Sequence, residues 1–265
     1  MPLAPEDATA LRAHLVSAGL AADVETSPGN VLGNCGKVAS GHVDYTFGLS
    51  DWRTATEQEV VAAVAELCGE PATTRDPDGP GWIDPDACVA AVGLHRDRLA
   101  SFALQRGRVL LATGHPTGLL PHYEAIARAL RAAGCEVLKP LDDVSDLMQQ
   151  GDRKLGIRFL DGVACAFSGG ELMHTHRSGL MEAMLAELAA RAGLPDLVVG
   201  DHGMAGAAVE RGIPALSIVD VNDPALILAQ VRSRTDAVLP IDDNLAPSLF
   251  EPVTAAMLEG LSSPT

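Results

Sequence analysis

After residue 107 the chain alternates short apolar runs with polar loops and with stretches of helical periodicity. Apolar runs bounded by Gly, Asp or Pro are typical of buried strands, whereas apolar positions three and four residues apart indicate helices. The runs predict strands at 109–112, 135–138, 157–168 (one or two strands), 197–200, 213–219 and 237–240. The periodic stretches predict helices at 119–133, 178–192, from 203 to about 211, from 223–224 onward and at 246–260, with a polar segment at 142–156.

The chain before residue 107 is less regular. Its apolar spacing predicts helices at 6–20, 56–69 and 84–105. The remaining segments are interpreted as a glycine-rich loop at 21–50 that leads into a short strand at 42–47, and a Pro/Gly/Asp-rich linker at 70–83. We therefore expect an N-terminal portion, 1–106, that packs on a core, 107–265; the alternative is a single domain, 1–265.

A strand, a polar loop and a helix, repeated several times, indicate an α/β fold with a doubly wound, mostly parallel sheet of the Rossmann-like type and a helical N-terminal portion. Composition supports this fold: the chain is 47% hydrophobic but only 3% aromatic. A core of Ala, Leu, Val and Ile suits parallel strands that helices cover on both faces. Ligands of such sheets bind at the carboxyl ends of the strands.

Charge and cysteine usage narrow the partners. The formal net charge of −16, without a basic patch, argues against nucleic acid as a partner. No apolar run is long enough to span a membrane, and the N-terminal stretch lacks the features of a signal peptide. An odd number of widely spaced cysteines without a CxxC pair indicates reduced thiols and a cytoplasmic protein, and makes a structural zinc cluster improbable. These cysteines are Cys35, Cys68, Cys88, Cys135 and Cys165.

Four polar loops, 113–118, 174–178, 200–204 and 220–224, concentrate the candidate chemistry. In the first loop, between a strand and a helix, glycine would let the backbone approach an anion at the helix N-terminus. Neither a dinucleotide fingerprint nor a P-loop is present. The alternative is an ordinary turn in which His115 caps the helix. The candidate substrate contacts here are Thr113, Gly114, Thr117 and Gly118.

The second loop contains His174 and His176, two residues apart. On an extended segment both imidazoles would point to the same face and could share a metal ion or an anion. The alternative is a pair of surface or capping histidines. Arg177 and Ser178 follow at the start of a helix and could add phosphate contacts.

The third loop places Asp201, His202 and Gly203 directly after an apolar strand. Asp201 could bind a metal or orient an imidazole, and His202 could act as a general acid or base. Asp201 could equally serve as the N-cap of the next helix. The histidines within predicted helices, His14, His95 and His122, are interpreted as surface or packing residues.

The last two polar turns also follow apolar strands. In the fourth loop Asp220 is the better candidate ligand, because Asp223 precedes Pro224 and suits an N-cap. Asp242 and Asp243 come after the last strand and are expected to cap the final helix.

The ordered motifs Thr113–Pro116, His174–His176, Val199–Gly203 and Asp223–Pro224 resemble those of an actinobacterial family whose members are usually named phosphatase. The resemblance covers roughly residues 5–260 and implies hydrolysis of phosphomonoesters. In this chain Arg177 and Ser178 follow His176, where we expect a small or hydroxyl residue directly; an inward-pointing Arg177 would alter anion specificity.

Residues and resemblance together give a first hypothesis of a metal-assisted phosphatase for a small phosphorylated metabolite. In it His174, His176, Asp201 and Asp220, with His115, gather a divalent ion (Mg, Mn or Zn), and His202 protonates the leaving alcohol.

Two alternatives remain: a non-catalytic phosphosugar- or nucleotide-binding protein, and a metal-free sugar-phosphate isomerase or lyase with His115 and His202 as acid and base. A homodimer is left open. The glycine-rich segment 28–48, with Asn30, Asn34, Lys37 and His42, is interpreted as a surface loop or, alternatively, as a lid that contacts the substrate.

Overall fold

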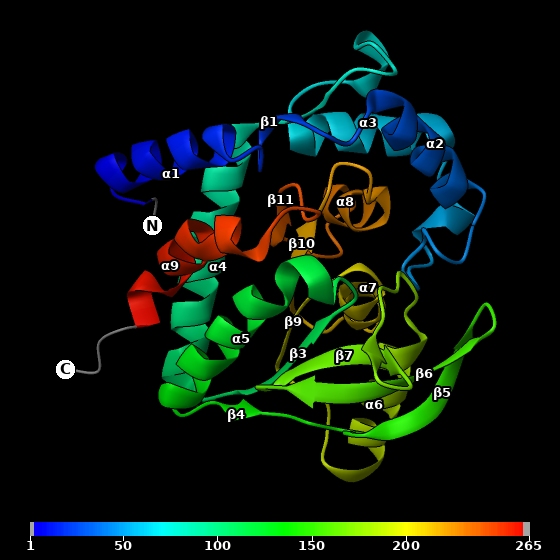
Figure 1. The fold of residues 1–265 in the computed structure, drawn as a ribbon, viewed down its shortest axis with the longest axis vertical. Helices are drawn as coiled ribbons and strands as arrows, with labels where there is room; N and C mark the ends of the chain where they lie inside the picture. Colours follow the sequence, from blue (N-terminus) through cyan, green and yellow to red (C-terminus); the bar gives the residue numbers. More distant parts are fainter. Residues whose placement is uncertain (1–2, 262–265) are drawn as a thin grey trace.

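The computed structural model describes residues 3–261, so residues 1–2 and 262–265, at the ends of the two portions expected from the sequence, lie outside the described residues. Its large sheet has the strand order β11-β10-β9-β3-β7-β6-β5, with β4 and β8 paired to β3 and β7 (Figure 1). Strands β11, β10, β9, β3, β4 and β7 are parallel where they pair, whereas β5, β6 and β8 join antiparallel. The strands are β3 (Arg108–Thr113), β4 (Glu136–Val137), β5 (Val144–Gln150), β6 (Arg153–Leu160), β7 (Val163–Ser168), β8 (Glu171–Leu172), β9 (Leu197–Asp201), β10 (Ala215–Val219) and β11 (Val238–Pro240).

Helices cover both faces of the sheet, as alternate residues of β3 show. Val109 and Leu111 belong to one hydrophobic cluster, whereas Leu110 and Ala112 belong to another. The first cluster lies against α1, α4, α5 and α9, and the second lies against α6 and α7. The doubly wound α/β fold is therefore confirmed. The helices are α1 (Pro5–Ser17), α2 (Pro28–Ala39), α3 (Glu57–Cys68), α4 (Pro85–Gln105), α5 (Pro116–Ala132), α6 (Gly179–Arg191), α7 (His202–Glu210), α8 (Pro224–Val231) and α9 (Glu251–Leu258).

The order of the strands reverses at β3. The chain leaves β3 through α5 to β4 and β7 on one side, then crosses through α6 to β9 on the other side. A crevice outside the carboxyl ends of the strands at such a reversal is where open α/β sheets bind ligands. The fold thus directs attention to the ends of β3 and β9, at Thr113 and Asp201.

The N-terminal portion is helical, but the prediction of a loop at 21–50 is wrong. Ser27 caps α2 by accepting a hydrogen bond from Asn30 N, and Pro28 occupies its first turn. The buried residues Val31, Asn34, Cys35 and Val38 have helical spacing, which the intervening glycines obscure.

The expected strand at 42–47 is also absent from the described residues. Instead the amides of Tyr45 and Thr46 donate to His42 O in a tight turn. Gly48 then has a positive φ of 80°, a conformation that favours glycine. Residues 42–48 therefore form a turn, which we call turn 42–48, and add no strand to the sheet.

Three other segments differ from the structure expected for them. The linker 70–83 contains β2 (Gly81–Ile83), which pairs antiparallel with β1 (Ala22–Val24). The polar segment 142–156 forms the hairpin of β5 with the start of β6. The segment 246–260, expected as one helix, consists of α9 with a short 3₁₀ turn on either side of it. These turns are Pro247–Phe250 and Glu259–Leu261.

Two expectations about the chain as a whole are met. All five cysteines are buried and unpaired. Within residues 3–261, every helix is too short or too polar to span a bilayer. One hydrophobic cluster also includes residues from both sides of position 106, such as Leu15 and Leu111.

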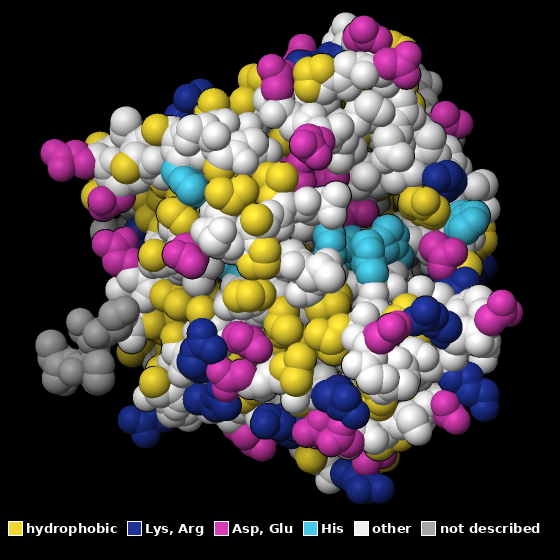
Figure 2. Space-filling view, in the orientation of Figure 1, with side chains coloured by type: hydrophobic (Ala, Val, Ile, Leu, Met, Phe, Trp, Pro, Cys, Tyr) yellow, Lys and Arg dark blue, Asp and Glu magenta, His cyan; other side chains and the backbone are white. Residues whose placement is uncertain are grey.

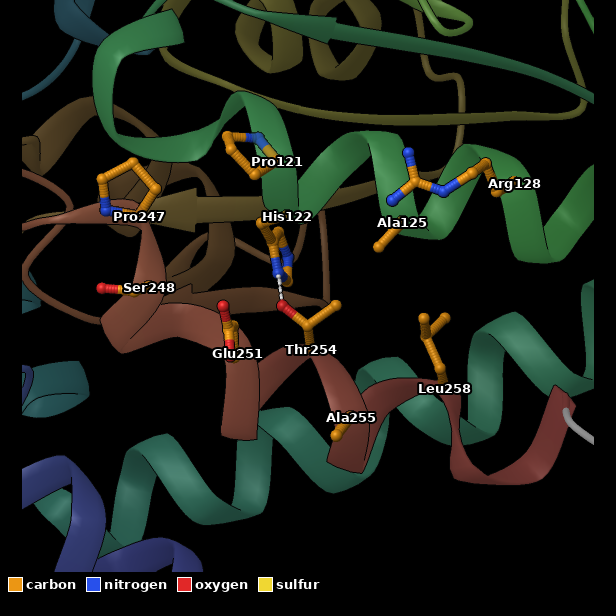
Figure 3. Close-up of a pocket in the computed structure, with 10 residues that line it drawn as sticks. All are labelled: Pro121, His122, Ala125, Arg128, Pro247, Ser248, Glu251, Thr254, Ala255 and Leu258. Atoms are coloured by element: carbon orange, nitrogen blue, oxygen red, sulfur yellow. Dashed lines mark hydrogen bonds between the residues drawn. The ribbon is translucent and has the colours of Figure 1, made fainter.

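Two histidines of the helical layer are buried and neutral. His95 of α4 donates through Nε2 to Ala237 O at 2.9 Å, and burial lowers the pKa of its imidazole to about 4. His122 of α5 points toward α9 and contacts Thr254 Oγ1 at 2.7 Å (Figure 3). Burial lowers the pKa of His122 to about 3. Both are packing residues, as the sequence predicted.

These histidines make the stability of the fold sensitive to acid. In the unfolded chain a histidine takes up a proton near pH 6.5, whereas folded His95 does so only near pH 4. The unfolded state therefore binds more protons in this window, and stability falls as the pH drops through it. We expect His95→Gln to reduce the slope of unfolding free energy against pH by about 1 kcal/mol per pH unit near pH 5. Urea denaturation from pH 4.5 to 7.5 measures this slope; equal slopes near pH 5 would contradict the prediction, and equal slopes above pH 7 serve as its control.

Candidate functional site

A buried carboxylate joins the ends of the two strands at the reversal point. Asp201, the last residue of β9, accepts hydrogen bonds from Thr113 Oγ1 at 2.6 Å and from Gly114 N at 2.6 Å, both at the end of β3. Its Oδ1 also accepts from His202 Nδ1 at 2.9 Å. Asp201 stands at the N-cap position of α7 but caps no helical amide. Its carboxylate instead fixes two loops and one imidazole.

Four imidazoles gather beside this carboxylate, and on the surface histidine side chains form a group next to acidic ones (Figure 2). The rings of His115 and His174 stack with centroids 4.5 Å apart, and those of His176 and His202 stack at the same distance. His174 and His176 lie 4.8 Å apart and join the two pairs. Three of the predicted loops therefore meet in one cluster.

Two carboxylates complete the cluster from neighbouring strand ends. His202 Nε2 lies 3.2 Å from Asp223 Oδ2 and 3.7 Å from Asp243 Oδ2. Asp243 Oδ2 also lies 3.4 Å from His115 Nδ1, and neither of these two buried atoms has a hydrogen-bond partner among the described residues. We call the six residues His115, His174, His176, His202, Asp223 and Asp243 the histidine–aspartate cluster.

The distances of 3.2 to 3.7 Å among His115, His202, Asp223 and Asp243 are close to the edges of a metal coordination shell. Ligand atoms about 2.0–2.1 Å from a tetrahedral zinc lie roughly 3.3 Å from one another. In two sets of three donor groups the ligand atoms lie within 4.8 Å of one another: His115, His174 and His202, and His202, Asp223 and Asp243. The cluster could therefore hold a divalent cation, and His202 belongs to both sets.

Hydrogen bonds at the far side of two rings orient them toward the cluster. His202 contacts Asp201 through Nδ1, and His176 contacts Asp44 O through Nδ1 at 3.0 Å. A carbonyl oxygen only accepts, so Nδ1 of His176 carries the proton and leaves Nε2 with its lone pair. Metal-binding histidines are held in this manner by a carboxylate or a carbonyl.

Charge is crowded in the cluster. Burial opposes the charged form of His202, but Asp223 and Asp201 raise its pKa well above the usual value. Burial likewise opposes protonation of His115, yet Asp243 raises its pKa. One side of His174 is open to solvent, but the desolvation of its inner side and the nearby imidazoles lower its pKa to about 3. The carboxylates and the neighbouring imidazoles therefore shift the pKa values of these histidines in opposite directions.

The backbone at His202 is strained. Asp201 ends β9 and His202 begins α7 with a φ of +42°, a left-handed conformation that is uncommon for residues other than glycine. Such a conformation costs about 1–3 kcal/mol and persists where surrounding contacts enforce it. It turns the imidazole back toward the strand ends.

The glycines of the predicted loops permit close approach of protein backbone. A Cβ at Gly114 would lie 2.3 Å from Thr175 O, and one at Gly203 would lie 2.3 Å from the carbonyl carbon of Arg177. These contacts bring segment 174–177 against β3 and α7. A Cβ at Gly118 would meet Asp243 O at 2.5 Å.

Other predicted site residues lie away from the cluster or are occupied. Asp220 accepts from Thr26 Oγ1 at 2.6 Å and from Val221 N at 2.7 Å, so the geometry favours Asp223 and Asp243 over Asp220 as ligands. Arg177 pairs with Asp44, and Ser178 Oγ donates to Glu182 at 2.6 Å. Thr117 is exposed on the first turn of α5.

Sequence reasoning gave Asp223 and Asp243 only capping roles. Asp223 does occupy the N-cap position of α8, but its side chain caps no amide, and no described helix begins at Asp243. Both follow buried strands, the same signal that singled out Asp201. Sequence analysis missed two residues beside the cluster. The buried hydroxyl of Tyr123 lies near Asp201, and the ring of Phe47 lies edge-on to that of His202 with centroids 5.4 Å apart.

A surface cavity of about 460 Å³ lies elsewhere, between α5 and α9 (Figure 3). His122, Arg128 and Glu251 are among the residues that line it, and none of the histidine–aspartate cluster does. It is therefore separate from the site described above.

Comparison with known proteins finds a matching family model and a similar protein. The model of a family described as Phosphatase matches residues 6–263. Phosphatase SCO2771 of Streptomyces coelicolor is similar to this chain, with 38% identity over 258 residues that cover 94% of each protein.

The close approach at Gly203 can be tested with a matched glycine. Gly203→Ala would place a Cβ against the backbone of Arg177, so we expect a loss of about 1–3 kcal/mol of stability. Gly33 lies on the exposed side of α2, where an added Cβ would meet no atom within 4 Å, and Gly33→Ala should gain roughly 0.5–1 kcal/mol. Urea denaturation of both variants measures the difference; similar stabilities would show that segment 174–177 does not press on α7.

Proposed function

Because the chain belongs to the Phosphatase family, we propose that it hydrolyses phosphate monoesters of a small metabolite with the help of a divalent cation bound by the histidine–aspartate cluster. The observation that carries the proposal is a pair of buried atoms, His115 Nδ1 and Asp243 Oδ2, that have no hydrogen-bond partner among the described residues. Leaving such atoms unsatisfied costs about 1–3 kcal/mol each, which a bound cation would offset.

The donor set favours a particular class of metal. Imidazole nitrogen suits zinc and other transition metals, whereas magnesium prefers an all-oxygen shell that retains water. The cluster offers four imidazoles and two carboxylates within one compact volume. Zinc therefore fits these residues better than magnesium does.

We assign His202, Asp223 and Asp243 as the ligands at the inner side of the cluster, with His115 and His176 beside them. A bound divalent cation would polarise the phosphoryl oxygens and lower the pKa of a water molecule. His202 is 3% exposed and faces carboxylates, which favours a ligand role over donation of a proton to the leaving alcohol. His174 is the imidazole of the cluster most open to solvent, so we assign it to contact with the substrate.

Asp201 acts in this proposal as a positioning residue. Three donors already occupy its carboxylate: the Thr113 hydroxyl, the Gly114 amide and His202 Nδ1. It would hold His202 in the tautomer that leaves Nε2 for the ligand. Carboxylates that orient a metal-binding histidine commonly change metal affinity about 10–100-fold when they are replaced.

The metal and the activity can be tested with neighbouring carboxylates. We expect purified protein with added Zn or Mn to hydrolyse a panel of phosphomonoesters, and Asp243→Asn to lose both bound metal and at least about 100-fold in activity. Elemental analysis and phosphate release measure these losses. Asp242→Asn is the matched control: Asp242 is equally buried, but its Oδ1 accepts from Asn244 N, a role that an amide oxygen can also fill.

The outcomes separate the three functions. Turnover that depends on metal and is lost in Asp243→Asn supports the proposal. Turnover of sugar phosphates that chelators leave unchanged would instead favour an isomerase or lyase. Ligand binding without turnover in any metal would favour a binding protein.

The role of Asp201 gives a second prediction. Asp201→Asn keeps the shape of the side chain but replaces one acceptor oxygen by an NH2 group and removes the charge. At least one of the three donors then faces the wrong group, and the hydrogen bond that fixes the tautomer of His202 weakens. We expect metal affinity to fall about 10–100-fold, with activity restored when the metal concentration is raised. Metal titration followed by activity measures this shift; loss of activity at every metal concentration would mean that Asp201 touches the reacting atoms.

A further inference from the structure

The chain has three lysines, and one of them lies beside the histidine–aspartate cluster. Lys37, near the end of α2, is half-buried and donates from Nζ to Asn34 Oδ1 and to Tyr45 OH, each at 3.0 Å. Its ammonium also lies 4.2 Å from the centre of the Tyr45 ring. Among residues 3–261, no carboxylate lies within 4.0 Å of this charge, so Lys37 is a partly desolvated cation with neutral partners alone.

Two chains of contacts connect Lys37 with the cluster. Tyr45, which accepts from Lys37, lies edge-on to His176 with ring centroids 5.9 Å apart. Asn34 donates to Asn222 O at 2.9 Å, and Asn222 directly precedes Asp223. The ammonium is thus held at a defined place beside the cluster, separated from His176 by the width of a tyrosine ring.

The other cation connected to the cluster is already neutralised. Arg177 forms an ion pair with Asp44 and donates to Gln149 O at 3.0 Å. An incoming anion would have to displace Asp44 to bind Arg177, whereas Lys37 carries no such competitor. Of these two side chains, Lys37 is therefore the better anion-binding group.

The separation between Lys37 and the cluster indicates which anion it binds. The ring of His176 lies between Tyr45, to which it is edge-on at 5.9 Å, and His202, on which it stacks at 4.5 Å. A phosphoryl group bound through a cation at His202, Asp223 and Asp243 would therefore be separated from Lys37 by the rings of Tyr45 and His176. We propose that Lys37 binds a second anionic group of the same substrate, so that the enzyme prefers phosphomonoesters that also carry a carboxylate or another phosphate. This inference rests on the proposed function and deepens it.

Electrostatics support a dedicated cation at this position. The chain carries a net charge of −16, and Asp201, Asp223 and Asp243 are buried in the site. A substrate with a second negative group would be repelled by this surface unless a positive group received that charge. A charge-assisted hydrogen bond to an ammonium is about twice as strong as a neutral one.

Substrate pairs with the same carbon skeleton test the proposal. We would compare 3-phosphoglycerate with glycerol 3-phosphate, which lacks the carboxylate, and fructose 1,6-bisphosphate with fructose 6-phosphate. The wild-type protein should favour the more acidic member of at least one pair, mainly through KM. In Lys37→Met the ratio of kcat/KM within that pair should fall about 10–100-fold, because a hydrogen bond to a charged group is lost. Lys37→Arg should retain most of the preference.

Lys139 and Lys154 provide matched controls. Lys139 follows β4 and is exposed, and Lys154 lies on β6, where it pairs with Asp146 at 3.5 Å. Lys139→Met should leave the ratio unchanged.

Amine acetylation read by mass spectrometry gives a measure that does not need turnover. 3-Phosphoglycerate should protect Lys37 from acetylation more than glycerol 3-phosphate does, whereas the labelling of Lys139 and of Lys154 should be the same with either compound.

The possible failures are distinguishable. An unchanged ratio in Lys37→Met, with the metal content and circular dichroism of the wild type, would overturn the role of Lys37 while the phosphatase proposal stands. Absence of turnover on every phosphomonoester would instead overturn the proposed function. In that case the acetylation experiment decides about Lys37 alone: selective protection supports anion binding, and equal labelling with both probes rejects it.

Discussion

The buried carboxylate of Asp201 is the contact on which the site depends. It accepts from the hydroxyl of Thr113, the amide of Gly114 and the imidazole of His202, and so joins the ends of β3 and β9 where the strand order reverses. These bonds hold the pKa of the carboxyl below its usual value in spite of complete burial. A buried charge is tolerated when its partners satisfy it in this way. Because both loops and the imidazole share one anion, the positions of Gly114 and His202 relative to each other follow from it.

The rest of the site is less well satisfied. Asp223 and Asp243 are buried close to four imidazoles, and atoms of His115 and Asp243 lack hydrogen bonds among the described residues. The strained φ of His202 adds to this cost. Cores seldom retain unsatisfied polar groups unless they serve a function, so the expense indicates selection for ligand binding rather than for stability. Asp201, whose hydrogen bonds are all made, holds His202 of the less well hydrogen-bonded cluster in place.

The sequence predicted the parts of this arrangement that depend on local patterns. Asp201 and His202 follow an apolar strand, and the pattern alone placed them at a carboxyl edge. Asp223 and Asp243 carry the same signal, but an aspartate before a helix suits a cap equally well, and only the path of the chain decides between the two. The glycines within α2 lower its helical propensity and so hid the helix, although Ser27 and Pro28 are suitable residues for its start. Tyr123 and Phe47 reach the site through tertiary packing, which no local pattern contains.

The contribution of the N-terminal portion explains why the site needs the whole chain. Asp44 O fixes the tautomer of His176, and Phe47 lies edge-on to both His176 and His202. The fit is close, since a Cβ at Gly206 of α7 would lie 2.1 Å from Phe47 O. The loops at the strand ends thus supply the donor atoms, whereas turn 42–48 orients the ring of His176. A portion that only covered a finished site would not need to hold one of its imidazoles, so turn 42–48 is part of the candidate site itself.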